Sequence, residues 1–276
     1  MPTDPTTAEN TSISAPPLEV PLPHQVLNEL YATMLRAQAL GRRLRAAQTN
    51  EAILAGALQN ADGSDVIVSA GAHPVLEVLA GADLSTFLRK TNGIAKLTER
   101  KIVAADPEIF AGIAAGLASA GQLVNSTSVI IAFAPGKLTR GSCFEKATEF
   151  AATNRLPLVM IADWTDTRRS SRNHDGRELS HWPFPTIAVD GRDVIAVYRV
   201  TKEAISAARR GHGPTLVDCV NFLAPGGRGR DERDPLLSFR GYLQRHNAWS
   251  DLRHSELTAE LRQEIGAAVS SRNRER

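Results

Sequence analysis

The chain has 276 residues, of which 42% are hydrophobic and 22% charged, a profile that suits one large α/β domain with a substantial core. Its net charge of +2 creates no strong field, so we expect neither nucleic acid nor a membrane as a partner. The apolar runs are too short to span a membrane and the N-terminus lacks a secretory signal, so we expect a cytoplasmic location.

Residues 1–23 are rich in Pro, Thr, Ser and Ala, which predicts a disordered tail, and we expect residues 24–276 to form a single domain. Helical spacing of leucines and short β-branched or apolar runs predict the elements that follow. In chain order they are a helix over 24–48, a strand over 65–70, helices over 73–89 and 107–123, strand 129–134, helix 142–154, strands 156–162 and 185–191, helix 193–210, strand 214–223 and a helix-prone tail from about 255.

These strands and helices alternate at the distances typical of βαβ units up to about residue 223. The runs 129–134 and 156–162 are almost wholly apolar, as in central parallel strands that are covered on both faces. We therefore expect an α/β fold with one open, mostly parallel sheet and helices on both faces. A ligand would bind outside the carboxyl ends of the strands.

The sequence contains no Walker A or G-x-G-x-x-G motif, and its seven histidines show no metal-binding spacing. Cys143 and Cys219 fall in a predicted helix and a predicted strand, so we expect small buried side chains in a reducing compartment. His73 follows a predicted strand and either lines a site or, more commonly for such a residue, caps a helix or faces solvent. Arg168 and Arg169 lie in a basic loop after a central strand, and they are either solvated or part of an anion cradle.

The stretch VDGRDVIAVYRVTKEAISAARRGHGPTLVD at 189–218 carries a D-G-x-D-V-x-A-V-Y pattern, a helix and a G-x-G-P-T-L stop. With LYATMLRAQALGRRLRAAQ, EIFAGIAAGLASA and EKATEFAATNRLPLVMIAD, it resembles the α subunit of the thiamine-diphosphate-dependent E1 component of 2-oxo acid dehydrogenase complexes. That family includes the pyruvate, branched-chain and acetoin enzymes, and the likeness covers about residues 25–265. The resemblance implies the thiamine-diphosphate-binding fold and a β-type partner subunit.

The resemblance also implies a cofactor site. In the family, a Gly-Asp-Gly turn gives a carboxylate and a later Asn gives an amide oxygen to Mg²⁺, which bridges the diphosphate of thiamine diphosphate. Here Ala-Pro-Gly at 134–136 and Thr165 stand at these positions, and Ala-Gly-Ala-His at 70–73 stands where the family has Tyr-Arg-Asp-His. The candidate cofactor-binding residues at positions that correspond to the family's site are His73, Gly136 and Thr165. A diphosphate held without metal would need cations instead, and the candidates near the same edge of the sheet are Lys137, Arg168 and Arg169.

Three functions follow from this departure, because a proline at 135 offers no side-chain oxygen to a metal ion. The first is a non-catalytic E1-α-like pseudoenzyme with a structural or regulatory role, in a heterotetramer with an E1-β-like subunit or in a homodimer. The second is an active oxidoreductase subunit with a rebuilt site, which decarboxylates a 2-oxo acid and transfers the acyl group to lipoamide. The third is a metal-free anion-binding module that uses Lys137, Arg168 and Arg169.

Overall fold

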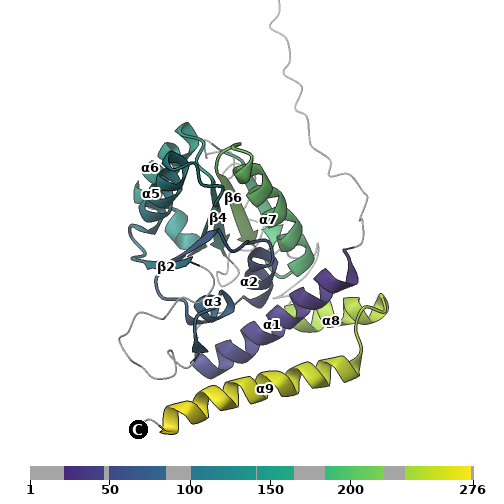
Figure 1. Cartoon of the computed structure of the whole chain (residues 1–276). Coiled ribbons are helices and arrows are strands. Elements are labelled where there is room, and N and C mark those ends of the chain that lie inside the picture. Colours follow the sequence, from purple (N-terminus) through teal and green to yellow (C-terminus); the bar gives the residue numbers. More distant parts are fainter. Residues whose placement is uncertain are drawn as a thin grey trace, which may run out of the picture.

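The computed structural model describes residues 22–46, 50–84, 101–140, 142–164, 184–220 and 234–274. Within these residues, six strands form one sheet in the order β2-β1-β3-β4-β6-β5, and every neighbouring pair is parallel (Figure 1). The strands are β1 (Val66–Ala70), β2 (Lys101–Ala105), β3 (Ile130–Pro135), β4 (Leu158–Asp163), β5 (Thr186–Asp190) and β6 (Thr215–Val220). The expected α/β class with a parallel sheet is confirmed.

Helices surround this sheet. They are α1 (His24–Leu44), α2 (Glu51–Leu58), α3 (Pro74–Leu79), α5 (Phe110–Leu123), α6 (Ser142–Thr153), α7 (Val194–Arg209), α8 (Pro235–Arg245) and α9 (Asp251–Arg274), with a short 3₁₀ turn η1 (Gly136–Arg140). Among the residues described, no helix combines the length and the apolar character needed to cross a membrane.

Apolar side chains alternate between the two faces of the sheet. On β3, Ile131 and Phe133 join the core formed with α2, α3 and α7, whereas Ile130 and Ala132 join the core formed with α5 and α6. Figure 1 shows α5 and α6 on one side of the sheet and α7 on the other. The central strands are therefore buried on both faces, which explains their continuous apolar sequence.

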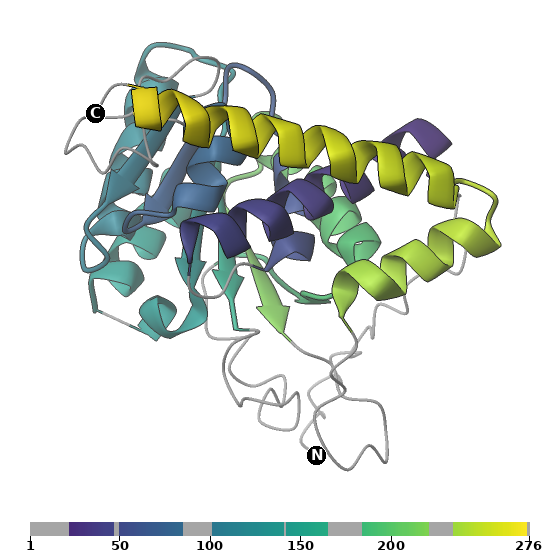
Figure 2. The ribbon, with the colours of Figure 1, turned by 90° about the horizontal axis from the view of Figure 1, so that it is seen from below.

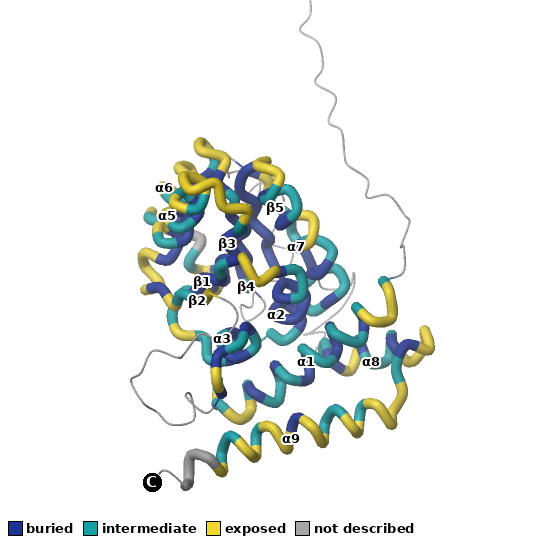
Figure 3. The backbone as a smooth tube through the Cα atoms, viewed as in Figure 1, coloured by how far each residue is buried: buried dark blue, intermediate teal, exposed yellow. Residues whose placement is uncertain are grey.

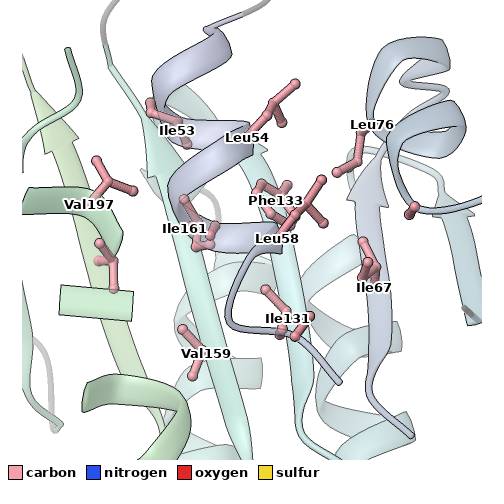
Figure 4. Packing of buried hydrophobic residues seen from close by; sticks show 14 of the residues in the cluster. Ile53, Leu54, Leu58, Ile67, Leu76, Ile131, Phe133, Val159, Ile161 and Val197 are labelled. Atoms are coloured by element: carbon pink, nitrogen blue, oxygen red, sulfur yellow. The ribbon is translucent and has the colours of Figure 1, made fainter. Parts of the chain in front are cut away.

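Helix α2 lies against the middle of the first face (Figure 4). It begins at Asn50, whose Oδ1 accepts hydrogen bonds from the N–H groups of Ala52 and Ile53 at 3.1 and 3.2 Å. Every residue from Ala52 to Leu58 is buried, so the segment has no polar face and no amphipathic period. This helix therefore carries no periodic signal in the sequence and is not among the predicted elements.

Helices α1, α8 and α9 form a third apolar cluster beside the first face (Figure 2). Tyr31 of α1 is fully buried, with its ring centroid 4.7 Å from that of Trp249 and 6.1 Å from that of Phe239. Its hydroxyl lies 3.1 Å from Nδ1 of His254 on α9. Helix α9 runs along α1 and leaves most of its residues exposed or half-buried (Figure 3).

Three predicted helix boundaries are wrong. Helix α1 ends at Leu44 instead of 48, because Arg45 takes the left-handed conformation with a φ of 50°. Helix α5 begins at Phe110 instead of 107, because the Asp106 carboxylate accepts the N–H of Glu108 at 2.9 Å and forms a turn around Pro107. Helix α3 ends at Leu79, after which the backbone turns through Gly81 with a φ of 109°. The remainder of the predicted helix, residues 85–89, lies outside the described residues.

Strand β2 and helix α8 were also missed. Strand β2 is a short edge strand with a partly exposed sequence, Lys-Ile-Val-Ala-Ala. Helix α8 did carry a signal, because Asp234 caps it by accepting the N–H of Leu236 at 2.9 Å and Pro235 occupies its first turn. The predicted tail lies, apart from its last two residues, outside the described residues.

Asp65, directly before β1, is the buried carboxylate at the amino edge of the sheet. Its side chain is 0% exposed, and Oδ1 accepts the N–H of Val129 at 2.8 Å. Nη2 of Arg209 donates to its two oxygens at 3.1 and 2.9 Å and also contacts Asp62 at 3.0 Å. These bonds join the end of α7 to the starts of β1 and β3.

We expect Asp65→Ala to lower the free energy of unfolding by about 3 kcal/mol, because it leaves buried donors and a guanidinium without their acceptor. Asp62→Ala is the matched control, since this exposed carboxylate shares Arg209 and should cost less than about 1 kcal/mol. Urea denaturation measures the free energy of unfolding of both variants. Equal losses in the two variants would contradict the proposed role of Asp65.

Candidate functional site

The order of the strands creates a crevice at the carboxyl edge of the sheet. From β1 the chain passes to β2 on one side, returns to β3 on the other side of β1 and continues to β4. Connections that leave in opposite directions open a crevice of the kind that binds ligands in α/β sheets. A cavity of about 290 Å³ lies here, lined by the ends of β1, β3 and β4 and by the start of α2.

The structure brings three of the expected site residues together at this cavity. His73 follows β1, and Gly136 and Lys137 follow β3. Gly136 is buried, whereas Lys137 is exposed. The expected site residues that lie outside the described part of the chain are Thr165, Arg168 and Arg169.

Two polar residues that the sequence analysis did not assign to the site also line the cavity. Asn50 comes from the cap of α2, and Asp163 is the last residue of β4. The sequence did contain a signal for Asp163, because this carboxylate ends a long apolar run and therefore lies at the carboxyl edge of the sheet. The other lining residues are apolar, namely Ile53, Leu54, Ala70, Ala72, Phe133, Ala134, Pro135 and Ile161.

Trp164 packs directly on Gly136. Because Pro135 pairs in register with Asp163, the next residues of the two strands meet just beyond the sheet. A Cβ atom placed on Gly136 would lie 2.0, 2.2 and 2.5 Å from Cδ2, Cε2 and Cγ of the indole. The Trp164 side chain is only 6% exposed, and its backbone N–H donates to the carbonyl of Cys219 at 2.9 Å. The indole therefore fills the space above the turn after β3.

Pro135 and Gly136, at the turn after β3, offer no side-chain oxygen to a magnesium ion. Mg²⁺ requires hard oxygen ligands in near-octahedral geometry, but Pro135 has no side-chain donor and Trp164 covers Gly136 with carbon atoms. Among the described residues, no group of three or more His, Cys, Asp or Glu side chains could hold a metal ion. Lys137 is the one cation among the described lining residues, which is little charge to balance a diphosphate.

His73 caps α3 and also lines the cavity. The sequence left open whether this residue lines a site or caps a helix, and the structure places it in both positions. Its Nδ1 accepts the N–H of Leu76 at 3.1 Å, and its own backbone N–H donates to Glu77 at 3.0 Å. Burial lowers the pKa of His73 below the ordinary value. The imidazole is therefore neutral near pH 7, and with Nδ1 as an acceptor, the proton is assigned to Nε2.

The sequence profile of the family described as "Dehydrogenase E1 component" matches residues 48–226. The chain is 32% identical over 181 residues to 3-methyl-2-oxobutanoate dehydrogenase subunit alpha of Mycobacterium tuberculosis, which covers 56% of this chain and 49% of that relative. It is 29% identical over 181 residues to 2-oxoisovalerate dehydrogenase subunit alpha of Bacillus subtilis, and this alignment covers 57% of this chain and 53% of that relative. The chain thus spans about half the length of the relatives it matches.

A solved structure of a thiamin diphosphate-dependent enzyme from Mycobacterium smegmatis aligns with 64% of this chain and 33% of its own. The sequence identity is 16% and the TM-score is 0.44, which supports no conclusion by itself. The family match therefore rests on the sequence profile and on the relatives, and it agrees with the thiamine-diphosphate-binding fold class expected from the sequence.

We expect Gly136→Ala to lower the free energy of unfolding by about 1–3 kcal/mol, because the added Cβ would overlap the Trp164 indole. In a Trp164→Ala background the same substitution should cost far less, because the ring is absent. A double-mutant cycle in urea measures this coupling. Gly63→Ala is the control, since a Cβ there meets nothing within 4 Å. An equal cost of Gly136→Ala in both backgrounds would refute the contact.

The lowered pKa of His73 predicts a pH dependence of stability. Below about pH 6.5 the imidazole binds a proton more readily in the unfolded chain than in the folded one. The free energy of unfolding should therefore fall as the pH drops. His73→Asn keeps a capping side chain and should remove this slope, whereas His73→Ala should also lose about 1 kcal/mol at pH 7. Urea denaturation between pH 5 and 8, with NMR titration of the imidazole, tests this. An imidazole pKa above 6.5 would be contrary evidence.

Proposed function

Because this chain belongs to the dehydrogenase E1 component family, we propose that it is an α-type E1 subunit with a structural or regulatory role instead of a catalytic one. The observation that carries this proposal is the packing of Trp164 on Gly136 beside Pro135. The sheet that would frame the cofactor is kept, but the position of the metal ligand holds a proline and the space above it holds an indole.

The negative charge of the diphosphate is the physical reason for this proposal. A diphosphate leaves water only where cations or hydrogen-bond donors replace its hydration, and a missing magnesium carboxylate removes several kcal/mol of metal binding. Among the described lining residues, Lys137 is the one cation, and it is exposed at the cavity. We propose that this site does not bind thiamine diphosphate with magnesium.

We further propose that the chain pairs with a β-type E1 subunit. The relatives from Mycobacterium tuberculosis, Bacillus subtilis and Acholeplasma laidlawii are each named as the alpha subunit of a 2-oxo acid dehydrogenase or pyruvate dehydrogenase. We also propose that residues 24–276 act as one domain and that the protein is cytoplasmic, where free thiols such as Cys219 are ordinary.

Calorimetric titration with thiamine diphosphate tests the proposed loss of the site. We expect no binding heat with or without Mg²⁺, and none when a β-type subunit is added. An E1 α subunit with an intact Gly-Asp-Gly turn serves as the positive control. Magnesium-dependent binding with a Kd of about 1 µM or below would overturn the proposal and support an active enzyme.

The same titration addresses the third function, metal-free anion binding. Binding that needs no Mg²⁺ and disappears in Lys137→Glu would favour an anion-binding module, because this residue is the cation that the structure places at the cavity. Lys202→Glu reverses the charge of an exposed lysine on α7 that does not line the cavity, and is the matched control.

A further inference from the structure

Helices α1 and α9 lie side by side and leave a groove between them (Figure 2). An ion pair between Arg36 and Glu264 and the contact of Tyr31 with His254 join the two helices. The groove has a volume of about 680 Å³, which is within the range of small-molecule sites. None of the described residues lines both this groove and the cavity at the carboxyl edge of the sheet, so a ligand here would be separate from the proposed function.

The floor of the groove is apolar and incompletely covered. Leu261, Ile265 and Val269 recur at every fourth position of α9 and therefore lie along one side of this helix. Leu261 is buried, whereas Ile265 and Val269 are only half-buried. Leu35 and Ala39 of α1 line the other side. An apolar chain in the groove would thus remove from water a surface that the fold itself leaves partly exposed.

The ionisable residues among the described lining residues are three arginines. Arg42 and Arg43 lie in the last turn of α1, and Arg262 lies in the middle of α9. All three are exposed, and none of them forms an ion pair or a hydrogen bond within the described residues. The helix dipole favours arginines in the last turn of α1, but it does not account for Arg262.

The carboxylates nearest to these arginines do not neutralise the groove. Glu264, two residues after Arg262, is engaged by Arg36. Glu51 attracts Arg42 only from beyond ion-pair distance. The groove therefore combines an apolar floor with positive charge that has no matching carboxylate in the described part of the chain, and its chemistry is complementary to a ligand that is both apolar and anionic.

The dimensions of the groove favour a small molecule over a further helix. An α-helix is about 10 Å across, so three of its turns would occupy about 1,300 Å³, roughly twice the volume of the groove. A bilayer surface is not favoured either, because Leu261 is buried and Ile265 and Val269 are half-buried instead of protruding, as side chains that enter a membrane must.

We propose that the α1–α9 groove, defined by Leu35, Ala39, Arg42, Arg43, Leu261, Arg262, Ile265, Gly266 and Val269, binds a free amphiphilic anion. The ligand has an acyl chain and a carboxylate or phosphate head. The chain packs on the apolar stripe of α9, and the head pairs with the guanidinium groups, which can hold a carboxylate or a phosphate through two parallel hydrogen bonds.

Isothermal titration calorimetry of the full chain with monomeric dodecanoate tests the proposal. We expect one site with a Kd of about 10 µM. The Kd should rise about tenfold for every two methylene groups that are removed from the chain, because each buried methylene contributes to binding. Dodecyltrimethylammonium, which has the same chain and the opposite charge, should not bind.

Gly266→Leu tests the place of the acyl chain. A Cβ on Gly266 meets nothing within 4 Å, so a leucine can enter the open groove without a clash, and it favours the helix. We expect the Kd for dodecanoate to rise at least tenfold. Ala267→Leu is the matched control, because this exposed neighbour does not line the groove. Circular dichroism verifies that both variants fold.

Arg262→Glu tests the place of the head. Loss of a charge-assisted hydrogen bond should raise the Kd for dodecanoate at least tenfold. Arg253→Glu makes the same change of charge at an exposed position of the same helix outside the groove, and its Kd should stay within about twofold of the wild type.

Four results would overturn the proposal. They are no saturable binding of dodecanoate, equal effects of each variant and its control, binding of phosphatidylglycerol vesicles without binding of monomeric dodecanoate, and binding of an acidic amphipathic helical peptide of leucine and glutamate without binding of dodecanoate. The third result would assign the groove to a membrane surface and the fourth to a partner protein. Dodecanoate binding by a chain that also binds thiamine diphosphate with Mg²⁺ supports this proposal and rejects only the proposed function.

Discussion

Both faces of a parallel sheet must be covered, and this constraint governs most of the molecule. Strands β3 and β4 are apolar at almost every position, so α2 and α7 must cover one face and α5 and α6 the other. This requirement does not involve the cofactor chemistry of the family. It explains why a chain can keep the framework of an E1 subunit after the residues at its carboxyl edge have changed.

At that edge, residues after β3 and β4 pack against each other. In register with each other, Pro135 and Asp163 end their strands together, and the next residues form a dry contact between an indole and a glycine. This contact presents carbon atoms at the turn after β3, where a magnesium site would need oxygen ligands. The crevice at the strand-order reversal follows from the topology, and its lining is largely apolar around four polar residues, His73, Asn50, Lys137 and Asp163.

The sequence predicted the central strands well, since continuous apolar runs between helices have few other interpretations. It failed where burial hides periodicity, as in α2, and where an edge strand is short, as in β2. At the site, the missing carboxylate was evident from Pro135. The role of Trp164 was not, because it depends on the register between β3 and β4 and on the absence of a side chain at Gly136.

The bond between Asp65 and Arg209 joins residues 144 positions apart. Almost the whole sheet lies between them in sequence, so the carboxylate obtains its guanidinium partner only after the last helix against the first face has been synthesised. Loop closure over such a span is entropically costly and slow. During synthesis on the ribosome, Asp65 can therefore accept the N–H of Val129 well before the Arg209 guanidinium becomes available, and β6, α8 and α9 are added only afterwards.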